Sequence, residues 1–302
     1  MKRLPFFTLD VFTKEAFSGN PLAVVLEADG LSDARMLAIA REFNLSETIF
    51  VQSPEDPAHS AKVRIFFPTA EIPFAGHPTI GCAILLAERR MKAGCSYQTR
   101  ITLEEQAGLV PVDVSRIGPV SFAMFTAPVI PHAVDLPLPD AGLLAAALGL
   151  QAADIGFGPH RPGLHEGGPR FLFIPIASAD ALARARPIEP HWSRAIAMAG
   201  VDSMWCYRAD GQGADFRARM FSPTAGIPED PATGSASALF ASQLRAAGLL
   251  ADGKNAFRIA QGVEMGRASD IRMEADVAGG ELAAVRIGGS AVRLMEGVLQ
   301  FD

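Results

Sequence analysis

The chain contains an internal duplication. Residues 64–73 read RIFFPTAEIP and residues 219–228 read RMFSPTAGIP, so seven of ten positions are identical. The two blocks are offset by 155 residues, about half of the 302-residue chain. An isolated PTA triplet recurs by chance, whereas an ungapped block with matching flanks indicates a repeated structural unit. The sequence therefore predicts two related halves with the same local structure at each copy.

Each copy has the pattern of a strand, a proline-rich turn and the start of a helix. The alternating runs 61–67 and 215–221 favour a strand that leads into each block. After the blocks, Pro78 and Pro231 suit the first turn of a helix, and apolar residues follow at helical spacing. Both halves are thus expected to place a helix N-terminus close to the end of a strand.

The rest of the chain combines many short strands with few helices, which is typical of an α+β fold rather than a regular βαβ repeat. Ser32 is expected to cap a helix that reaches Phe43. We interpret the polar stretch 158–170 as a long solvated loop, with a mobile flap as the alternative. Further strands are expected at FFTLDVF, PLAVVL, TIFVQ, TRITLE, GLVPVDV, PVSFAMF, FLFIPI, SMWCYR, AFRIA and DIRME.

Composition and charge indicate a globular protein without a nucleic-acid or membrane partner. The net charge is −6 and the densest basic point is the pair Arg89-Arg90, which does not suit a phosphate backbone. Cys82, Cys95 and Cys206 form no CxxC motif and no even-numbered framework, so we expect three free thiols and a reducing compartment. The apolar start is interrupted too early for a signal peptide, and no run approaches the ~20 apolar residues of a membrane helix. A cytoplasmic location is therefore expected.

The two predicted helix starts could bind an anion. Backbone N–H groups in the first turn of a helix lack intrahelical partners and carry partial positive charge, so two such ends facing each other would hold a carboxylate without any lysine. Gly76 and Gly234 would let a ligand approach the backbone, and Ser235 would add a hydroxyl donor. The alternative is that both turns are ordinary helix caps.

Three polar residues are candidates for chemistry, each with a simpler interpretation. Glu47 follows a predicted helix end and precedes an apolar strand, where partial desolvation would raise its pKa towards neutrality. His77 lies in a first helical turn, where the dipole favours a neutral imidazole. Taken separately, Glu47 could be a surface glutamate, His77 a structural histidine and Asp230 a helix cap.

Four stretches, taken in order, resemble the phenazine-biosynthesis (PhzF-like) isomerase family: DVFTKEAFSGNPLAVV, FNLSETIF, FPTAEIPFAGHPTIG and GIPEDPATGSA. The closing VRIGGSAVRLMEGVL also fits, so the likeness covers essentially the whole chain. It implies a fold similar to diaminopimelate epimerase, with two pseudo-symmetric domains that each wrap a curved, mostly antiparallel sheet around a central helix. The expected domains are 1–120 with 284–302, and 121–283. The family also implies an active site between the domains, and a homodimer.

The resemblance assigns roles to the matching positions. It makes Glu47 the proton-transferring acid/base, with His77 and Asp230 as its polar partners. It implies a small anionic substrate, which in the phenazine enzyme is a dihydro-hydroxyanthranilate, and no cofactor. The residues that it implies for substrate binding are Ser46, Gly76, Gly234 and Ser235.

The residue types at the two helix starts bear on the kind of reaction. Related epimerases use two cysteines, but neither predicted helix start carries a thiol, and Cys82 falls inside its helix. A single carboxylate that takes a proton and returns it to another carbon on the same face would perform an isomerisation. An epimerase, racemase or dehydratase of a hydroxy or amino acid is the alternative, and a non-catalytic small-acid-binding protein is another. The remaining histidines lack ligand spacing and the GxGxxG motif is absent, so neither metal nor nucleotide cofactor is expected.

Overall fold

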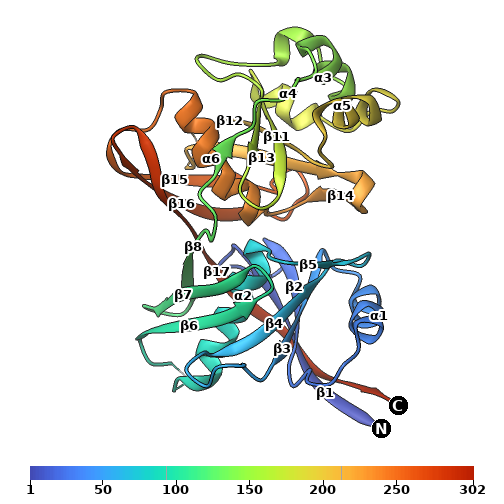
Figure 1. Cartoon of the computed structure of the whole chain (residues 1–302), viewed down its shortest axis with the longest axis vertical. Coiled ribbons are helices and arrows are strands. Elements are labelled where there is room, and N and C mark those ends of the chain that lie inside the picture. Colours follow the sequence, from blue (N-terminus) through green and yellow to red (C-terminus); the bar gives the residue numbers. More distant parts are fainter. Residues whose placement is uncertain (93, 212) are drawn as a thin grey trace. The chain divides into compact units, whose positions relative to one another are not determined.

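The computed structural model describes residues 1–92, 94–211 and 213–302, and it confirms an α+β protein in which strands outnumber helices (Figure 1). The chain divides into two compact units. Unit 1 comprises Met1–Pro128 and Ile287–Asp302, and unit 2 comprises Val129–Arg286. The expected division placed residues 121–128 in the second domain and residues 284–286 in the first. Residues 121–128 belong to unit 1 because β8 (Ser121–Thr126) pairs antiparallel with β7 (Gly108–Arg116), and residues 284–286 belong to unit 2.

Unit 1 is one sheet built from nearly consecutive strands. Its pairings are β1–β2 antiparallel, β2–β3 parallel, β3–β4 antiparallel, β4–β6 parallel, and β6–β7 antiparallel. The last part of β17 pairs antiparallel with β1, from Ala291 opposite Val11 to Phe301 opposite Lys2. The other elements are β1 (Lys2–Val11), β2 (Asn20–Val25), α1 (Asp33–Phe43), β3 (Glu47–Gln52), β4 (Ala61–Phe66), β5 (Glu71–Ile72), α2 (Gly76–Arg90), β6 (Tyr97–Glu105) and β17 (Glu281–Phe301).

Unit 2 repeats this succession of pairings. They are β10–β11 antiparallel, β11–β12 parallel, β12–β13 antiparallel, β13–β15 parallel, and β15–β16 antiparallel. The elements are β9 (His132–Ala133), α3 (Ala141–Leu148), η1 (Ala152–Asp154), β10 (Gly163–Glu166), β11 (Arg170–Pro175), α4 (Ala179–Arg184), α5 (His191–Ala199), β12 (Met204–Ala209), β13 (Phe216–Ser222), η2 (Pro223–Ala225), β14 (Ile227–Asp230), α6 (Gly234–Ala246), β15 (Gly253–Gln261) and β16 (Ser269–Ala278).

One helix in each unit is buried on nearly all sides. In unit 1, α2 packs against β1, β2, β3, β6, β7 and β8, and in unit 2, α6 packs against β9, β10, β11 and β16. A helix that contacts sheet around most of its circumference needs apolar or small residues on every face, which both sequences supply. Gly81 of α2 permits the closest approach, because a Cβ there would lie 2.5 Å from the Leu22 side chain.

The duplicated blocks form the predicted elements, since β4 and β13 precede the turns and α2 and α6 follow them. The helix capped by Ser32 is also confirmed: the Ser32 side chain accepts the Arg35 N–H, and Asn44 ends the helix in the left-handed conformation. The three cysteines are free, as predicted. Within the described ranges, no helix is both long and apolar enough to cross a bilayer.

The prediction of a solvated loop over residues 158–170 is wrong. β10 lies within this stretch and pairs with β9 and β11. His165 of β10 is buried, with Nδ1 at 2.8 Å from the Ser242 hydroxyl and Nε2 at 2.6 Å from Gln243 Oε1. Burial lowers the pKa of His165 to about 4, so it is a neutral group inside a satisfied polar network. The polar His165 is therefore accommodated by hydrogen-bond partners on α6 rather than by exposure to water.

Candidate functional site

Glu47 is the first residue of β3. α1 ends at Phe43, Asn44 turns the chain with φ 50°, and the strand begins three residues later opposite Leu22 of β2. The Glu47 side chain is buried and Ser46 beside it is partly exposed. The predicted position between a helix end and an apolar strand is therefore confirmed.

His77 lies beside Glu47. It is the second residue of α2, it is 2% exposed, and its Nδ1 lies 3.4 Å from Glu47 Oε2. Burial lowers the pKa of His77 to about 3, although the Pro21 carbonyl favours the protonated ring. The imidazole is thus neutral at physiological pH, as its place in a first helical turn predicts, and it faces Glu47 as a polar neighbour rather than as a cation.

Asn20 is a third buried polar residue in unit 1, next to His77, the neighbour of Glu47. It is the first residue of β2, it is fully buried, and its Nδ2 lies 3.4 Å from His77 Nδ1. Sequence reasoning did not single it out, because it is separated from His77 by 57 positions. The available signal was the SGNP motif at residues 18–21, whose Gly and Pro are typical of a turn but do not indicate which group the Asn20 side chain contacts.

The helix starts are not capped by the side chains of their N-cap residues. Ala75, the N-cap of α2, is extended, and its methyl side chain cannot accept a hydrogen bond from the first-turn N–H groups. Thr233, the N-cap of α6, also makes no side-chain cap bond. Gly76 and Gly234 are the first residues of the two helices and both are buried, while Ser235 is partly exposed. Each first turn therefore keeps the partial positive charge that an anion needs.

Asp230 is held by a buried turn in unit 2. It ends β14, it is 5% exposed, and its Oδ2 accepts a hydrogen bond from the Thr233 hydroxyl at 2.6 Å. The fully buried Gln261 donates through Nε2 to the Asp230 carbonyl at 2.8 Å and accepts at Oε1 from the Thr233 N–H at 3.3 Å. Gln261 thus fixes the turn from β14 to α6, a role that sequence reasoning missed because β15 supplies it from a distance.

Gly262 allows the chain to pass this turn closely. It adopts a positive φ of 72°, and a Cβ there would lie 2.7 Å from the Pro231 carbonyl oxygen and 2.6 Å from that of Arg267. Gly266 in the same turn has a φ of 71°, and a Cβ there would meet nothing within 4 Å. Substitutions at the two glycines can therefore be compared. Both would cause left-handed backbone strain, but only a substitution at Gly262 would also clash with backbone atoms.

We expect Gly262→Ala to destabilise unit 2 by about 2–4 kcal/mol, because left-handed strain and a backbone clash combine. Gly266→Ala should cost only about 1 kcal/mol, because strain acts alone. Urea unfolding followed by tryptophan fluorescence measures both, since Trp192 and Trp205 are buried in unit 2. Equal losses in the two variants would show that the contact with Pro231 is unimportant.

The structure thus groups the predicted site residues within each unit. In unit 1, Glu47 and His77 are in contact. Cys82 is the seventh residue of α2, where burial raises the pKa of its thiol far above the usual range and makes it a poor nucleophile. In unit 2, Asp230 lies one short turn before α6. No group of three or more His, Cys, Asp or Glu side chains among the described residues is arranged to hold a metal ion.

The comparisons with known proteins agree with these motifs. The model of a family described as phenazine biosynthesis-like protein matches residues 9–297. The chain belongs to this family. It is 42% identical over 307 residues to an uncharacterized isomerase of Mesorhizobium japonicum, with 99% of each chain covered. It is 36% identical over 292 residues to the trans-2,3-dihydro-3-hydroxyanthranilate isomerase of Pseudomonas aeruginosa, covering 97% of this chain and 98% of that one.

Solved structures give the same result for the fold. A PhzF family phenazine biosynthesis protein of Bacillus anthracis superposes with a TM-score of 0.88 at 25% identity, with 100% of both chains covered. A hydroxyproline epimerase of Agrobacterium vitis superposes with a TM-score of 0.64 at 16% identity, over 99% of this chain and 91% of that one, and shares the fold alone. Together with the named relatives, these findings confirm the prediction of a PhzF-like isomerase.

Proposed function

We propose that this PhzF-like isomerase moves a proton within a small, cyclic carboxylic acid and that Glu47 is its single acid/base. The observation that carries the proposal is the buried contact between Glu47 and a neutral His77 at the start of α2. A positively charged imidazole would favour the ionised form of a neighbouring buried carboxyl, whereas an uncharged one does not. Glu47 can therefore take up and release a proton beside His77. The isomerase names of the relatives support the reaction class.

In the proposed reaction, the Glu47 carboxylate removes a proton from a carbon of the substrate, and the electron pair enters the conjugated system next to the substrate carboxylate. The protonated Glu47 then delivers the same proton to another carbon on the same face. Neutral His77 hydrogen-bonds the reacting region without competing for the proton. Backbone N–H groups in first helical turns whose N-cap side chains make no capping bond stabilise the charge that develops on the substrate carboxylate.

We assign binding roles to the remaining residues from the family resemblance. Ser46 and Gly76 lie next to the two catalytic residues of unit 1, which supports their role in holding polar groups of the substrate. Gly234 and Ser235 begin α6, and Asp230 precedes it, which supports a second polar contact to the substrate. The chemistry of these residues needs neither a metal ion nor an organic cofactor.

We also infer that the two units are pseudo-symmetric copies of one ancestral unit. The duplicated block and the identical succession of strand pairings support this inference. It predicts that superposing β4 and α2 on β13 and α6 in an experimental structure brings Gly76 onto Gly234. A superposition that aligns the strands but displaces one helix start by several residues would contradict it.

The direct test of function uses trans-2,3-dihydro-3-hydroxyanthranilate, the substrate named for the Pseudomonas aeruginosa relative, in deuterium oxide. We expect isomerisation, with deuterium entering the product where the returning proton has exchanged with solvent. Cys82→Ala serves as a control that should leave the rate unchanged, because the proposal gives the thiol no role. Inversion at one carbon without a shift of a double bond would instead indicate an epimerase, and absence of any turnover would reject this substrate.

A further inference from the structure

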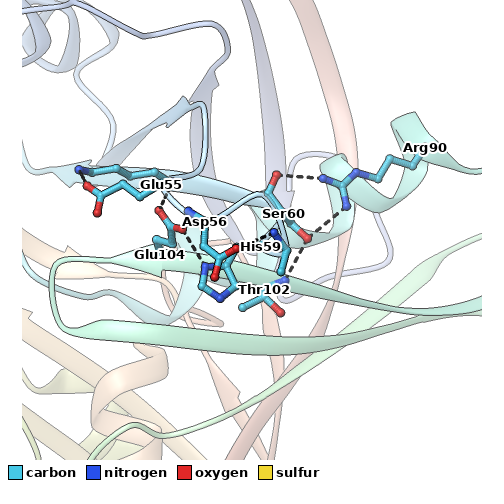
Figure 2. A network of polar contacts seen from close by, with 9 residues as sticks. Glu55, Asp56, His59, Ser60, Arg90, Thr102 and Glu104 are labelled. Carbon is cyan, nitrogen blue, oxygen red and sulfur yellow. Dashed lines mark hydrogen bonds and ion pairs between the residues drawn. The ribbon is translucent and has the colours of Figure 1, made fainter.

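Glu105 is a buried acid that the proposed reaction does not use. It is the last residue of β6 and is 7% exposed, whereas its neighbour Glu104 points to the opposite face of the strand. Glu104 accepts hydrogen bonds from the N–H groups of Glu55 and Asp56, at 2.8 and 2.9 Å, and lies 2.7 Å from His59 Nδ1; the dashed lines in Figure 2 mark this network. These partners lower the pKa of Glu104 to about 2. The two adjacent glutamates are therefore in opposite environments.

The partner of Glu105 is the Thr79 hydroxyl on α2. Thr79 Oγ1 lies 2.7 Å from Glu105 Oε1 and 2.8 Å from the carbonyl oxygen of Ala75. A hydroxyl has one proton to donate, and a carbonyl and an ionised carboxylate are both acceptors only. If Glu105 were ionised, Thr79 could satisfy one of the two contacts but not both. If Glu105 is protonated, it donates to Thr79, and Thr79 donates to Ala75, so every contact is a proper hydrogen bond.

The surroundings of Glu105 offer no charge that would stabilise its anion. Burial raises the pKa of Glu105 to about 8, against the lowering effect of the Thr79 hydrogen bond. The titratable group that interacts with it from α2 is the buried Cys82 thiol. In the described part of the chain, no ion pair includes Glu105, and its second oxygen, Oε2, has no hydrogen-bond partner.

Apart from Asp56, the ionisable side chains that line the same cavity as Glu105 are paired with one another. Glu105 contributes to the wall of a cavity of about 820 Å³ in unit 1. The charged residues in that wall form separate pairs, which are Lys62 with Glu55, Arg64 with Glu71, and His59 with Glu104. Asp56 is the remaining charged group of the wall, and it is acidic. Neither cation of the cavity is therefore available to Glu105.

We propose that protonated Glu105 is a positioning residue, which acts through Thr79 and the Ala75 carbonyl to hold the first turn of α2. Ala75 is the N-cap of this helix, and the next two residues are Gly76 and His77. The chain of hydrogen bonds thus runs from the end of β6 to the backbone that carries the proposed catalytic histidine. The effect on turnover rests on the proposed function, whereas the hydrogen-bond chain itself does not.

The proposal predicts a loss of stability and of activity at alkaline pH. Because the pKa of Glu105 in the folded protein lies above the ordinary value of 4.5, its contribution to stability is complete below about 4.5 and is lost as the pH rises through about 8. Above that pH, a buried anion lies behind the first turn and competes with the Ala75 carbonyl for the Thr79 proton. The first turn, and His77 with it, should then loosen.

The test compares Glu105→Gln with Glu104→Gln over pH 6 to 10. A glutamine amide donates to Thr79 as a protonated carboxyl does, but it does not titrate. We expect the wild type to lose kcat with an apparent pKa near 8, Glu105→Gln to abolish this alkaline limb, and Glu104→Gln to keep it. Thr79→Val should lower kcat roughly ten- to a hundredfold with a smaller effect on KM, and Thr79→Ser should restore it.

A measurement without substrate separates this inference from the proposed function. Carbon-13 NMR of glutamate carboxyls, assigned by Glu105→Gln, should show one group that titrates near pH 8. If that signal is present while no substrate is turned over, the proposed function fails and the hydrogen-bond chain stands. If Glu105 titrates near 4.5, or if the alkaline limb survives in Glu105→Gln, the positioning role is overturned. Should Glu105→Gln not fold, the two Thr79 variants and the wild-type titration decide.

Discussion

The Glu47→Gln variant is expected to stay folded and to lose about 10²- to 10⁴-fold in the rate of proton exchange. An amide has the shape of the carboxyl and keeps its contact with His77, but it has no basic oxygen with which to remove a proton from carbon. Because Glu47 begins β3 and its backbone is fixed by the register with β2, the substitution leaves the strand in place. The loss should therefore appear in kcat, with little change in substrate affinity.

The matched control is Glu42→Gln, which removes a carboxylate from an exposed position on α1, five residues before Glu47. It should exchange deuterium at the wild-type rate. Both variants should bind an unreactive cyclic acid, such as 3-hydroxyanthranilate, with the wild-type dissociation constant in a calorimetric titration. If Glu47→Gln exchanges solvent deuterium as fast as Glu42→Gln, the acid/base is another residue and the proposed mechanism is wrong.

What the sequence predicts well is the local structure of the duplicated block. The signals used were alternation over the strands, prolines in the following turns and apolar residues at helical spacing. Each of these patterns is contained within a few residues, so β4, α2, β13 and α6 could be located from the sequence alone. Glu47 and His77 could be placed at a helix end and a helix start for the same reason. Their contact depends on the packing of α2 against β3, which no local pattern contains.

The residues that sequence reasoning missed act across long distances in the chain. Asn20 reaches His77 over 57 positions, and Gln261 reaches Thr233 over 28. His165 looked solvated because the partners that justify its burial lie 77 and 78 positions away on α6. In the sequence alone, Glu104 and Glu105 look like two solvent-exposed glutamates. Only the strand geometry shows that Glu105 faces inward. Polar residues with remote partners are those that a single sequence identifies least well.

The duplicated block also starts with an arginine in each copy, and the structure shows a shared use for it. In unit 1, Arg64 Nε donates to Glu71 of β5 at 2.7 Å. In unit 2, Arg219 Nε and Nη2 donate to the two carboxylate oxygens of Glu229 on β14, both at 2.8 Å. Each arginine thus joins a strand of the block to the short strand that follows its turn. Such forked pairs fix geometry as well as charge.

The two arginines differ in what else they hold. Arg219 is 7% exposed, and its Nη1 also donates to three carbonyl groups at the end of α4. The acceptors are Leu182 at 2.9 Å, Ala183 at 3.0 Å and Ala185 at 2.8 Å. The second contact of Arg64 is instead to the exposed Asp33 at 2.8 Å. Removing Arg219 therefore takes a donor away from buried acceptors, whereas water can replace most of what Arg64 provides.

We expect Arg219→Met to lower the free energy of unfolding by about 3–5 kcal/mol, the usual effect of breaking one side of a buried, hydrogen-bonded pair. Arg64→Met should lower it by about 1 kcal/mol, as for a partly exposed pair. Tryptophan fluorescence in urea reports the first variant, because both tryptophans lie in unit 2, and circular dichroism reports the second.

The double variant Arg219→Met with Glu229→Leu separates the ion pair from the bonds to α4. Removing both charges should restore the part of the loss that comes from leaving Glu229 unpaired, while the part due to the three carbonyl groups should remain. A double variant as unstable as Arg219→Met alone would assign the whole effect to α4. Equal losses for Arg219→Met and Arg64→Met would instead show that burial of the arginine is irrelevant, and would contradict the argument from geometry.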